Sequence, residues 1–176
     1  MGYPVKRIVV TGANGSGKTY LARCLSNLMP AARLVSFDAI KLTENWKQKS
    51  KVDIYGALEA TVTEDCWILE GGPSLLEKAL DRADLVVWLD PPFWRRAMRL
   101  LIRPWKYLGQ TRPELPDGNI DWPIQQYRFA VQSLRRSNAF HKKIAAELGG
   151  FPSEKIIVCR YASDLERVMN RVGGSN

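Results

Sequence analysis

The sequence predicts a three-layer α/β protein in which helices cover both faces of a five-stranded parallel sheet. Five short apolar segments alternate with longer segments that have helical periodicity. A glycine-rich turn joins the first apolar segment to the first helical one. The chain has 176 residues, which is enough for one domain with a sizeable core and too short for two comfortable ones. Residues 1–176 are therefore expected to form a single domain.

The strands are recognised by apolar runs that end at glycine, proline or polar residues. They are expected at residues 6–11, 32–38, 66–72, 84–92 and 154–160. The helices are recognised by apolar residues three and four positions apart. They are expected at residues 17–30, 52–63, 74–83, 93–107, 122–148 and 163–172, with a loop rich in proline and glycine at 108–123. Ligands of such sheets bind at the carboxyl ends of the strands, so the residues that follow each strand are site candidates.

The turn after the first strand matches the pattern G-x-x-x-x-G-K-[ST] of a phosphate-binding loop at every fixed position. Its glycines let successive N–H groups point inward, and the helix that follows adds its positive end. Lys18 can reach the terminal phosphates, and Thr19 can bind Mg²⁺. The expected ligands are ATP and Mg²⁺, held by Gly12, Ala13, Asn14, Gly15, Ser16, Gly17, Lys18, Thr19 and Tyr20.

A magnesium ion at this loop needs a second anchor, usually an acidic residue at the end of a neighbouring strand. Glu70 ends the third strand and Asp90 ends the fourth. Glu70 is favoured, because the third strand lies beside the first in the phosphotransferase version of this fold. Asp90 is the alternative, and its other interpretation is a cap for the basic helix that follows.

The net charge of +8 is concentrated in one segment. Residues 95–143 contain eleven basic and three acidic residues, so this segment accounts for the whole excess. Arginine binds phosphate oxygens in pairs and keeps its charge. Two arginine faces joined by the 108–123 loop are expected to form a lid, over about 93–143, that closes on phosphates. The residues proposed to act in catalysis from the lid are Arg95, Arg99, Arg103, Arg128 and Arg135.

Asp38, at the end of the second strand, is the candidate acceptor residue. A carboxylate across the cleft from the phosphate loop can orient an attacking hydroxyl. Its alternative role is to cap the next helix. A GTPase would require an N-K-x-D motif, which the sequence lacks.

Together these motifs resemble the P-loop kinases of the adenylate-kinase-like superfamily, and most closely the bacterial DNA topology modulation proteins. The matching segments are "GANGSGKT", "FDAI", "DCWILEGG" and "ADLVVWLDPPFWRR". The resemblance implies the strand order 2-3-1-4-5 and places Arg160, after the fifth strand, beside the adenine. It does not imply a nucleoside monophosphate as acceptor, because Ser74 stands where the superfamily has an arginine that grips that substrate.

The expected function is an ATP-dependent kinase that transfers the γ-phosphate to a hydroxyl or phosphate of an acceptor. The acceptor can be a nucleoside, a nucleotide, another small metabolite or a group on nucleic acid, which the basic segment keeps open. Two alternatives remain: a nucleotide-gated regulator that binds nucleic acid, and a slow ATPase switch. Three cysteines without metal-binding spacing and the lack of a spanning segment favour a cytoplasmic protein with no membrane partner.

Overall fold

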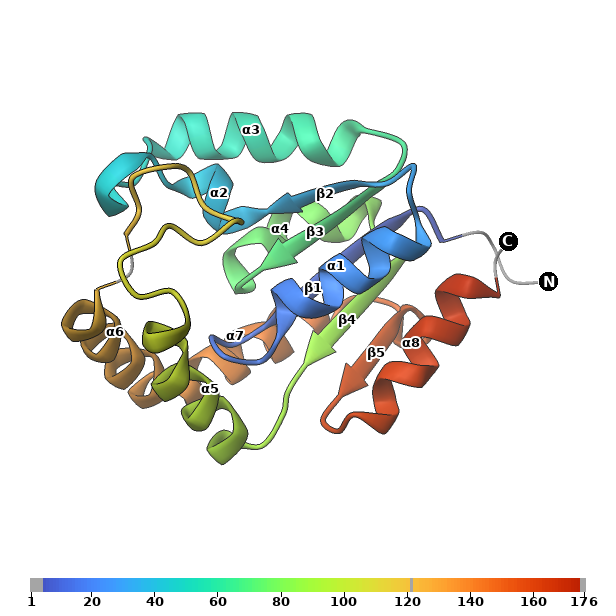
Figure 1. The fold of residues 1–176 in the computed structure, drawn as a ribbon. Coiled ribbons are helices and arrows are strands. Elements are labelled where there is room, and N and C mark those ends of the chain that lie inside the picture. Colours follow the sequence, from blue (N-terminus) through green and yellow to red (C-terminus); the bar gives the residue numbers. More distant parts are fainter. Residues whose placement is uncertain (1–4, 121, 175–176) are drawn as a thin grey trace.

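The computed structural model describes residues 5–120 and 122–174. Their strands form a single five-stranded sheet (Figure 1). The strands are β1 (Arg7–Gly12), β2 (Arg33–Ser36), β3 (Trp67–Gly71), β4 (Leu85–Leu89) and β5 (Ile156–Cys159). All pairs are parallel, and the order is β2-β3-β1-β4-β5. The predicted fold class and strand order are therefore confirmed.

Helices cover both faces of the sheet (Figure 1). One face is covered by α1 (Lys18–Leu28) and α8 (Ser163–Gly173), whose Leu21, Leu25 and Val168 pack on Ile8 and Val10 of β1. The other face is covered by α2 (Phe37–Lys41), α3 (Lys51–Thr63), α4 (Leu76–Ala79) and α7 (Ser137–Leu148). Short 3₁₀ turns complete the connections: η1 (Glu44–Trp46), η2 (Pro73–Leu75), η3 (Leu80–Arg82) and η4 (Ser153–Lys155).

The alternation of side chains along β1 explains these two cores. Ile8 and Val10 belong to one cluster and Val9 to the other, and all three are fully buried. A strand whose two faces are both covered reads as a continuous apolar run rather than as an alternating one. This is why the segment Ile8–Val10 could be recognised as an internal strand from the sequence alone.

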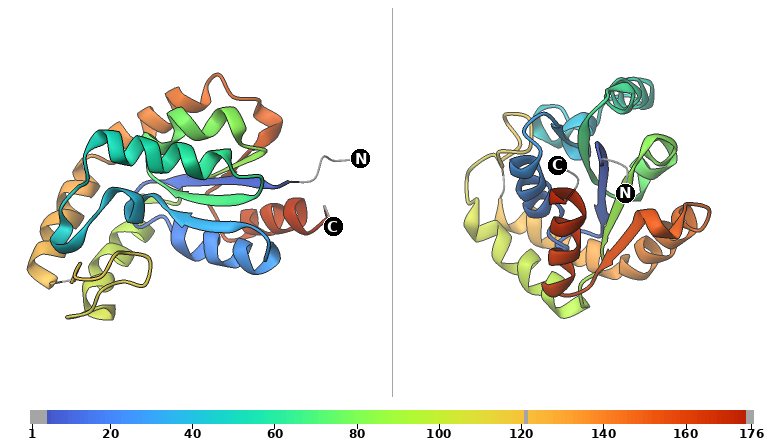
Figure 2. Two further views of the ribbon diagram at one scale, coloured as in Figure 1. Left: turned by 90° about the horizontal axis from the view of Figure 1, so that it is seen from above. Right: turned by 90° about the vertical axis from the view of Figure 1, so that its right-hand side faces the viewer.

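Two helices stand at the end of the sheet where the strands finish. These are α5 (Phe93–Lys106) and α6 (Pro123–Arg135), which pack against each other (Figure 2). The loop between them reaches back toward α2 and carries an isolated bridge between Thr111 and Ile120. Contacts of Ser133, Arg96 and Arg99 place the two helices beside the phosphate loop, and their role as a lid stays a prediction.

The structure corrects two expectations about local structure. The predicted long helix 122–148 is two helices, since the chain leaves helical geometry at Arg136 (φ −88°, ψ 7°). α7 then packs on the sheet through Ile144 and Leu148. Asp38 lies in the first turn of α2 and not at the end of a strand, because β2 stops at Ser36.

Candidate active site

The phosphate loop lies between β1 and α1, and its glycines hold conformations that other residues rarely adopt. Gly15 has φ 78° and Gly17, which precedes α1, has φ 103°. A Cβ on Gly12 would lie 2.4 Å from the carbonyl oxygen of Leu89. The Ser16 hydroxyl is buried without a hydrogen-bond partner among the described residues. Because such groups are rarely left unpaired, a phosphate oxygen in the loop is a fitting partner for it.

Lys18 begins α1, and its ammonium group folds back over the loop. Nζ donates a hydrogen bond to the Ala13 carbonyl oxygen at 3.2 Å. Burial lowers the pKa of this ammonium group, and the negative charges of Glu70 and Asp38 offset only part of that effect. A desolvated cation gains much more from an anionic partner than an exposed one does. Lys18 is therefore suited to bind phosphate oxygens.

Glu70 and Thr19 meet beside the loop because β3 pairs with β1. The hydroxyl of Thr19 donates to Glu70 Oε1 at 3.4 Å, and the hydroxyl of Ser36 donates to the same oxygen at 2.7 Å. Burial raises the pKa of the Glu70 carboxyl, although Lys18 and Ser36 act in the opposite direction. Mg²⁺ binds oxygen ligands and usually takes few from the protein, the rest coming from water and phosphate. The donor pair Thr19 and Glu70 fits a magnesium ion.

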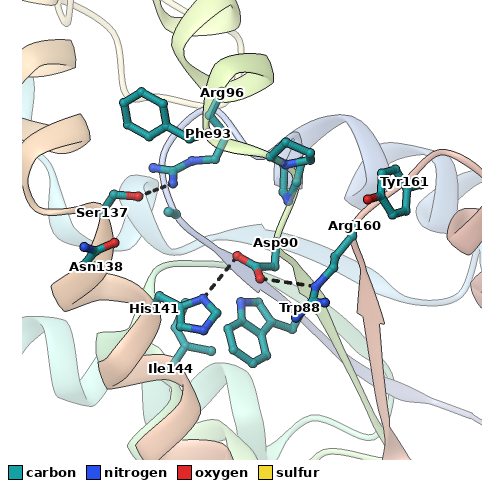
Figure 3. Close-up of a pocket in the computed structure, with 13 residues that line it drawn as sticks. Trp88, Asp90, Phe93, Arg96, Ser137, Asn138, His141, Ile144, Arg160 and Tyr161 are labelled. Carbon is teal, nitrogen blue, oxygen red and sulfur yellow. Dashed lines mark hydrogen bonds and ion pairs between the residues drawn. The ribbon is translucent and has the colours of Figure 1, made fainter.

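Asp90, the alternative metal ligand, faces different partners. One carboxylate oxygen lies 3.3 Å from His141 Nδ1 and the other 3.7 Å from Arg160 Nε (Figure 3). These residues line a cavity of about 320 Å³ between the end of β4, the start of α5 and α7. Ala13 is the phosphate-loop residue in this lining. Asp90 therefore lies beside His141 and Arg160, whereas Glu70 accepts hydrogen bonds from two hydroxyl groups.

A larger cavity of about 850 Å³, here called the acceptor cavity, opens on the other side of the phosphate loop. Lys18 and Asp38 both line it. Its basic lining residues are Lys18, Lys41, Arg103, Arg112, Arg136 and Lys143. Its large apolar lining residues are Leu42, Trp46, Leu115, Phe129 and Phe140. Asp38 is the only carboxylate among the lining residues that the structure describes.

The Asp38 carboxylate is held in its ionised form. Lys41 Nζ lies 2.8 Å from Asp38 Oδ1. Burial works against ionisation, but Lys41, followed by Lys18 and Arg112, outweighs it, and the pKa of Asp38 lies below its ordinary value. At neutral pH this group therefore presents acceptor oxygens to whatever fills the cavity.

The arginines of α5 that face the phosphate loop differ in part from those expected. Arg96 is buried, and its Nε donates to the Asn14 carbonyl oxygen at 3.1 Å. Arg99 Nη1 donates to the Ser16 carbonyl oxygen at 2.8 Å. Arg103 lines the acceptor cavity, whereas Arg95 lies over the ring of Trp94, 5.1 Å from its centroid. Positions three and seven apart share a helix face as well as positions four apart do. Arg96, Arg99 and Arg103 have this spacing, so the sequence could have identified the face of α5 that points to the phosphate loop.

Four other candidates lie outside the acceptor cavity. Arg128 and Arg135 are exposed on α6, and Tyr20 is exposed on α1. None of these three lines either cavity. Arg160 lines the smaller cavity together with Tyr161. The neighbour of Arg135, Arg136, stands at the helix break and lines the acceptor cavity.

A buried asparagine, Asn119, joins the two segments that cover the acceptor cavity. These are the η1 turn and the loop between α5 and α6. The backbone N–H of Trp46 donates to Asn119 Oδ1 at 2.6 Å. Asn119 Nδ2 donates to the carbonyl oxygens of Thr43, at 2.9 Å, and Pro116, at 2.8 Å. Arg112 lies over the Trp46 ring, 5.4 Å from its centroid. The lid loop and the η1 turn are therefore fastened together, an arrangement that no local pattern in the sequence indicates.

Comparison with solved structures places this geometry in a known fold. A shikimate kinase from Acinetobacter baumannii in complex with shikimate is 16% identical, with a TM-score of 0.52 over 98% of this chain and 95% of that one. A gluconokinase from Sinorhizobium meliloti 1021 is 15% identical, with a TM-score of 0.55 over 98% and 92%. A shikimate kinase from Bacteroides thetaiotaomicron is 18% identical, with a TM-score of 0.54 over 94% and 97%.

The chain therefore has the fold of the P-loop kinases over nearly its whole length. No protein-family model and no curated protein matches the sequence. The narrower resemblance to the DNA topology modulation proteins is not confirmed by these comparisons.

Proposed function

We propose that the protein is an ATP-dependent phosphotransferase whose acceptor is a small anionic molecule with a free hydroxyl group. The main support is that one cavity is lined both by Lys18 of the phosphate loop and by the carboxylate of Asp38. A kinase requires this arrangement, since the phosphoryl group and the hydroxyl must meet in a shared space that excludes water.

Each residue has a defined task in this proposal. When bound, ATP with Mg²⁺ supplies the phosphoryl group and part of the neutralising charge. Lys18 binds terminal phosphate oxygens, and Thr19 and Glu70 provide the metal ligands. Arg99 and Arg103 stabilise negative charge that develops on the transferred group. Gly12–Thr19 supplies inward N–H groups, and Arg160 borders the base.

Asp38 acts on the acceptor. Its ionised oxygens accept a hydrogen bond from the attacking hydroxyl and orient the oxygen lone pair toward phosphorus. Because the pKa of Asp38 is lowered, it is a weak base, and its contribution is orientation with late proton transfer. This suits a loose transition state, in which the nucleophile needs little activation.

The charge of the cavity supports an anionic acceptor. Six basic side chains line it against one carboxylate, so an anionic guest would meet complementary charge there. Carboxylates and phosphates match the planar forks of Arg112 and Arg136. The apolar side of the cavity, with Trp46 and Phe140, suits a carbon skeleton or ring.

The proposal is tested by a screen of acceptors with ATP labelled on its γ-phosphate. The set includes hydroxylated carboxylic acids, sugar acids, sugar phosphates, nucleosides, nucleotides and oligonucleotides. We expect label transfer to at least one hydroxylated anion, abolished by Lys18→Ala and strongly reduced by Asp38→Asn. Phosphate release to water at the same rate with every candidate would instead support the ATPase switch. Transfer to oligonucleotides alone would move the acceptor to nucleic acid.

The nucleic-acid-binding regulator makes a different prediction. Binding through several phosphate contacts falls steeply with salt concentration. If the protein binds an oligonucleotide tightly at about 50 mM salt, depends on ATP for that binding and transfers no label, the regulator replaces the kinase.

A further inference from the structure

Helix α5 exposes large apolar side chains in an ordered row. Trp94, Met98, Leu101, Ile102 and Trp105 are each between 53% and 64% exposed. Their spacing places them on one side of the helix, away from the buried side formed by Arg96, Leu100 and Pro104. Single exposed apolar residues are ordinary on a protein surface, but a contiguous patch of large ones marks an interaction site.

The row continues onto α6. The indole N–H of Trp105 donates to the hydroxyl of Tyr127 at 2.5 Å, and that hydroxyl donates to the Leu101 carbonyl oxygen at 3.2 Å. Ile124, three residues before Tyr127, is 77% exposed, and Val131, four residues after it, is 49% exposed. The apolar strip is defined here as Trp94, Met98, Leu101, Ile102, Trp105, Ile124, Tyr127 and Val131.

Basic side chains flank the strip on both sides. On α5 the next positions around the helix include Arg95 and Lys106. On α6, Arg128 and Arg135 follow Ile124 and Val131 at helical spacing, and both are exposed. This position explains why the two α6 arginines do not line the acceptor cavity. The described parts of the 95–143 segment thus place an apolar centre between two rows of cations.

We propose that the apolar strip and its basic flanks bind the surface of an anionic lipid membrane. A helix with apolar and tryptophan side chains on one face and Lys or Arg at its edges lies in the plane of the headgroups, with its apolar face inserted. Anionic headgroups attract the basic flanks, and the positive charge of this segment supplies the complementarity. In the described parts of the chain, no helix is both long and apolar enough to cross a membrane. The expectation of no membrane partner rested on the lack of a membrane-spanning segment. A helix that lies on the membrane surface needs no such segment.

Two other occupants fit the strip less well. Nucleic acid would stack on aromatic rings, but Met98, Leu101, Ile102, Ile124 and Val131 have no ring to offer. A second copy of the chain would bring its own basic flanks to the interface, and like charges there are repulsive. A bilayer satisfies both the aliphatic centre and the cationic edges.

The test is flotation of the full-length protein with vesicles. Phosphatidylcholine vesicles with about 30% phosphatidylglycerol are compared with pure phosphatidylcholine at about 100 mM salt, without nucleotide. We expect binding to the anionic vesicles only. The variant Met98→Gln/Leu101→Gln/Ile102→Gln should bind about tenfold or more weakly, because the charges remain while the inserting groups are lost. The matched control Val52→Gln removes an apolar side chain that is 80% exposed on α3 and should bind as the unaltered protein does.

The variants also decide between the occupants. Circular dichroism verifies that the triple variant is folded, and Arg128→Gln/Arg135→Gln should weaken binding while leaving the apolar strip intact. No binding to anionic vesicles, or binding that the triple variant leaves unchanged, would overturn the proposal. So would a dimer in sedimentation experiments that the triple variant dissociates, or a tight oligonucleotide complex that it abolishes.

Discussion

The hydroxyl of Thr19 donates to a carboxylate oxygen of Glu70 at 3.4 Å, although 50 residues separate them in the chain. The contact exists because β3 pairs with β1 in register, Val10 opposite Glu70, and places the strand end beside the first turn of α1. Asp90 follows the other neighbour of β1 but faces His141 and Arg160. Which of the two acids would hold the metal of the proposed kinase is therefore a question that mutation can decide.

Glu70→Gln should raise the magnesium concentration needed for half-maximal activity by about tenfold or more. The glutamine keeps the size and the oxygen that accepts from Ser36, but it lacks the charge that attracts a divalent cation. Asp90→Asn is the matched comparison and should change the requirement little. A magnesium titration of both variants measures this, and the reverse ranking would give the metal role to Asp90.

The same Glu70→Gln variant should be more stable than the unaltered protein at pH 7 in the absence of nucleotide and magnesium. Burial raises the pKa of Glu70 above its ordinary value of 4.5, so the folded state holds this proton more tightly than the unfolded state does. The free energy of unfolding therefore falls as pH rises from about 4.5 through the raised pKa. Denaturation curves between about pH 4 and 8 should show a smaller decline for Glu70→Gln than for the unaltered protein, and an equal decline in both would contradict this expectation.

Lys18→Ala should weaken ATP binding by roughly 100-fold and abolish transfer, because the loop loses its buried cation. The apoprotein should not lose stability. Burial lowers the pKa of Lys18, which means that its charged form is disfavoured in the folded state. Calorimetric titration with ATP and a thermal melt test both parts, and normal ATP affinity in the variant would contradict the phosphate-loop assignment.

Asp38→Asn should leave ATP affinity within about threefold and reduce transfer to the acceptor by roughly 10²–10⁴. Asparagine keeps the size and one acceptor oxygen but cannot take a proton. If Asp38 only capped α2, the substitution would change transfer little, since asparagine caps helices about as well as aspartate does. Steady-state kinetics with a fixed acceptor measure the effect, and unchanged transfer would favour the switch.

Arg99→Ala should slow both transfer and background hydrolysis, by up to about 10²-fold, because both reactions develop charge on the same phosphoryl oxygens. Arg95→Ala is the matched control on the same helix, since its guanidinium lies over the Trp94 ring, 5.1 Å from the ring centroid. Its rates should stay close to those of the unaltered protein. Equal losses in both variants would indicate a general charge effect rather than a positioned contact.

The sequence was sufficient where local chemistry decides the structure. The run Ile8–Val10 is buried on both faces, and the phosphate loop needs glycine at positions of positive φ, so both leave clear patterns. The helix break at Arg136 leaves only a weak one, Ser137 and Asn138, which favour caps and turns over helix interiors. It coincides with a long-range contact, in which Arg96 donates to the hydroxyl of Ser137 at 2.5 Å.

The contacts that close over the acceptor cavity could not be predicted from the sequence either. Asn119 joins Thr43 and Trp46 across more than 70 positions, and such contacts depend on the assembled fold. An asparagine in a loop rich in proline and glycine predicts a turn and nothing more. Local patterns therefore predicted the glycine conformations of the phosphate loop but not the contacts that close over the acceptor cavity.

The break at Arg136 lies between α6, which packs on α5, and α7, which packs on the sheet, and tryptophans lie on both sides of it. Trp94, Trp105 and Trp122 belong to or adjoin α5 and α6, whereas Trp67 and Trp88 are fixed in β3 and β4. Any swing of the two helices about the break would change the distances between these two groups of indoles. Intrinsic fluorescence should then follow opening and closing in real time, without a dye and without a mutation.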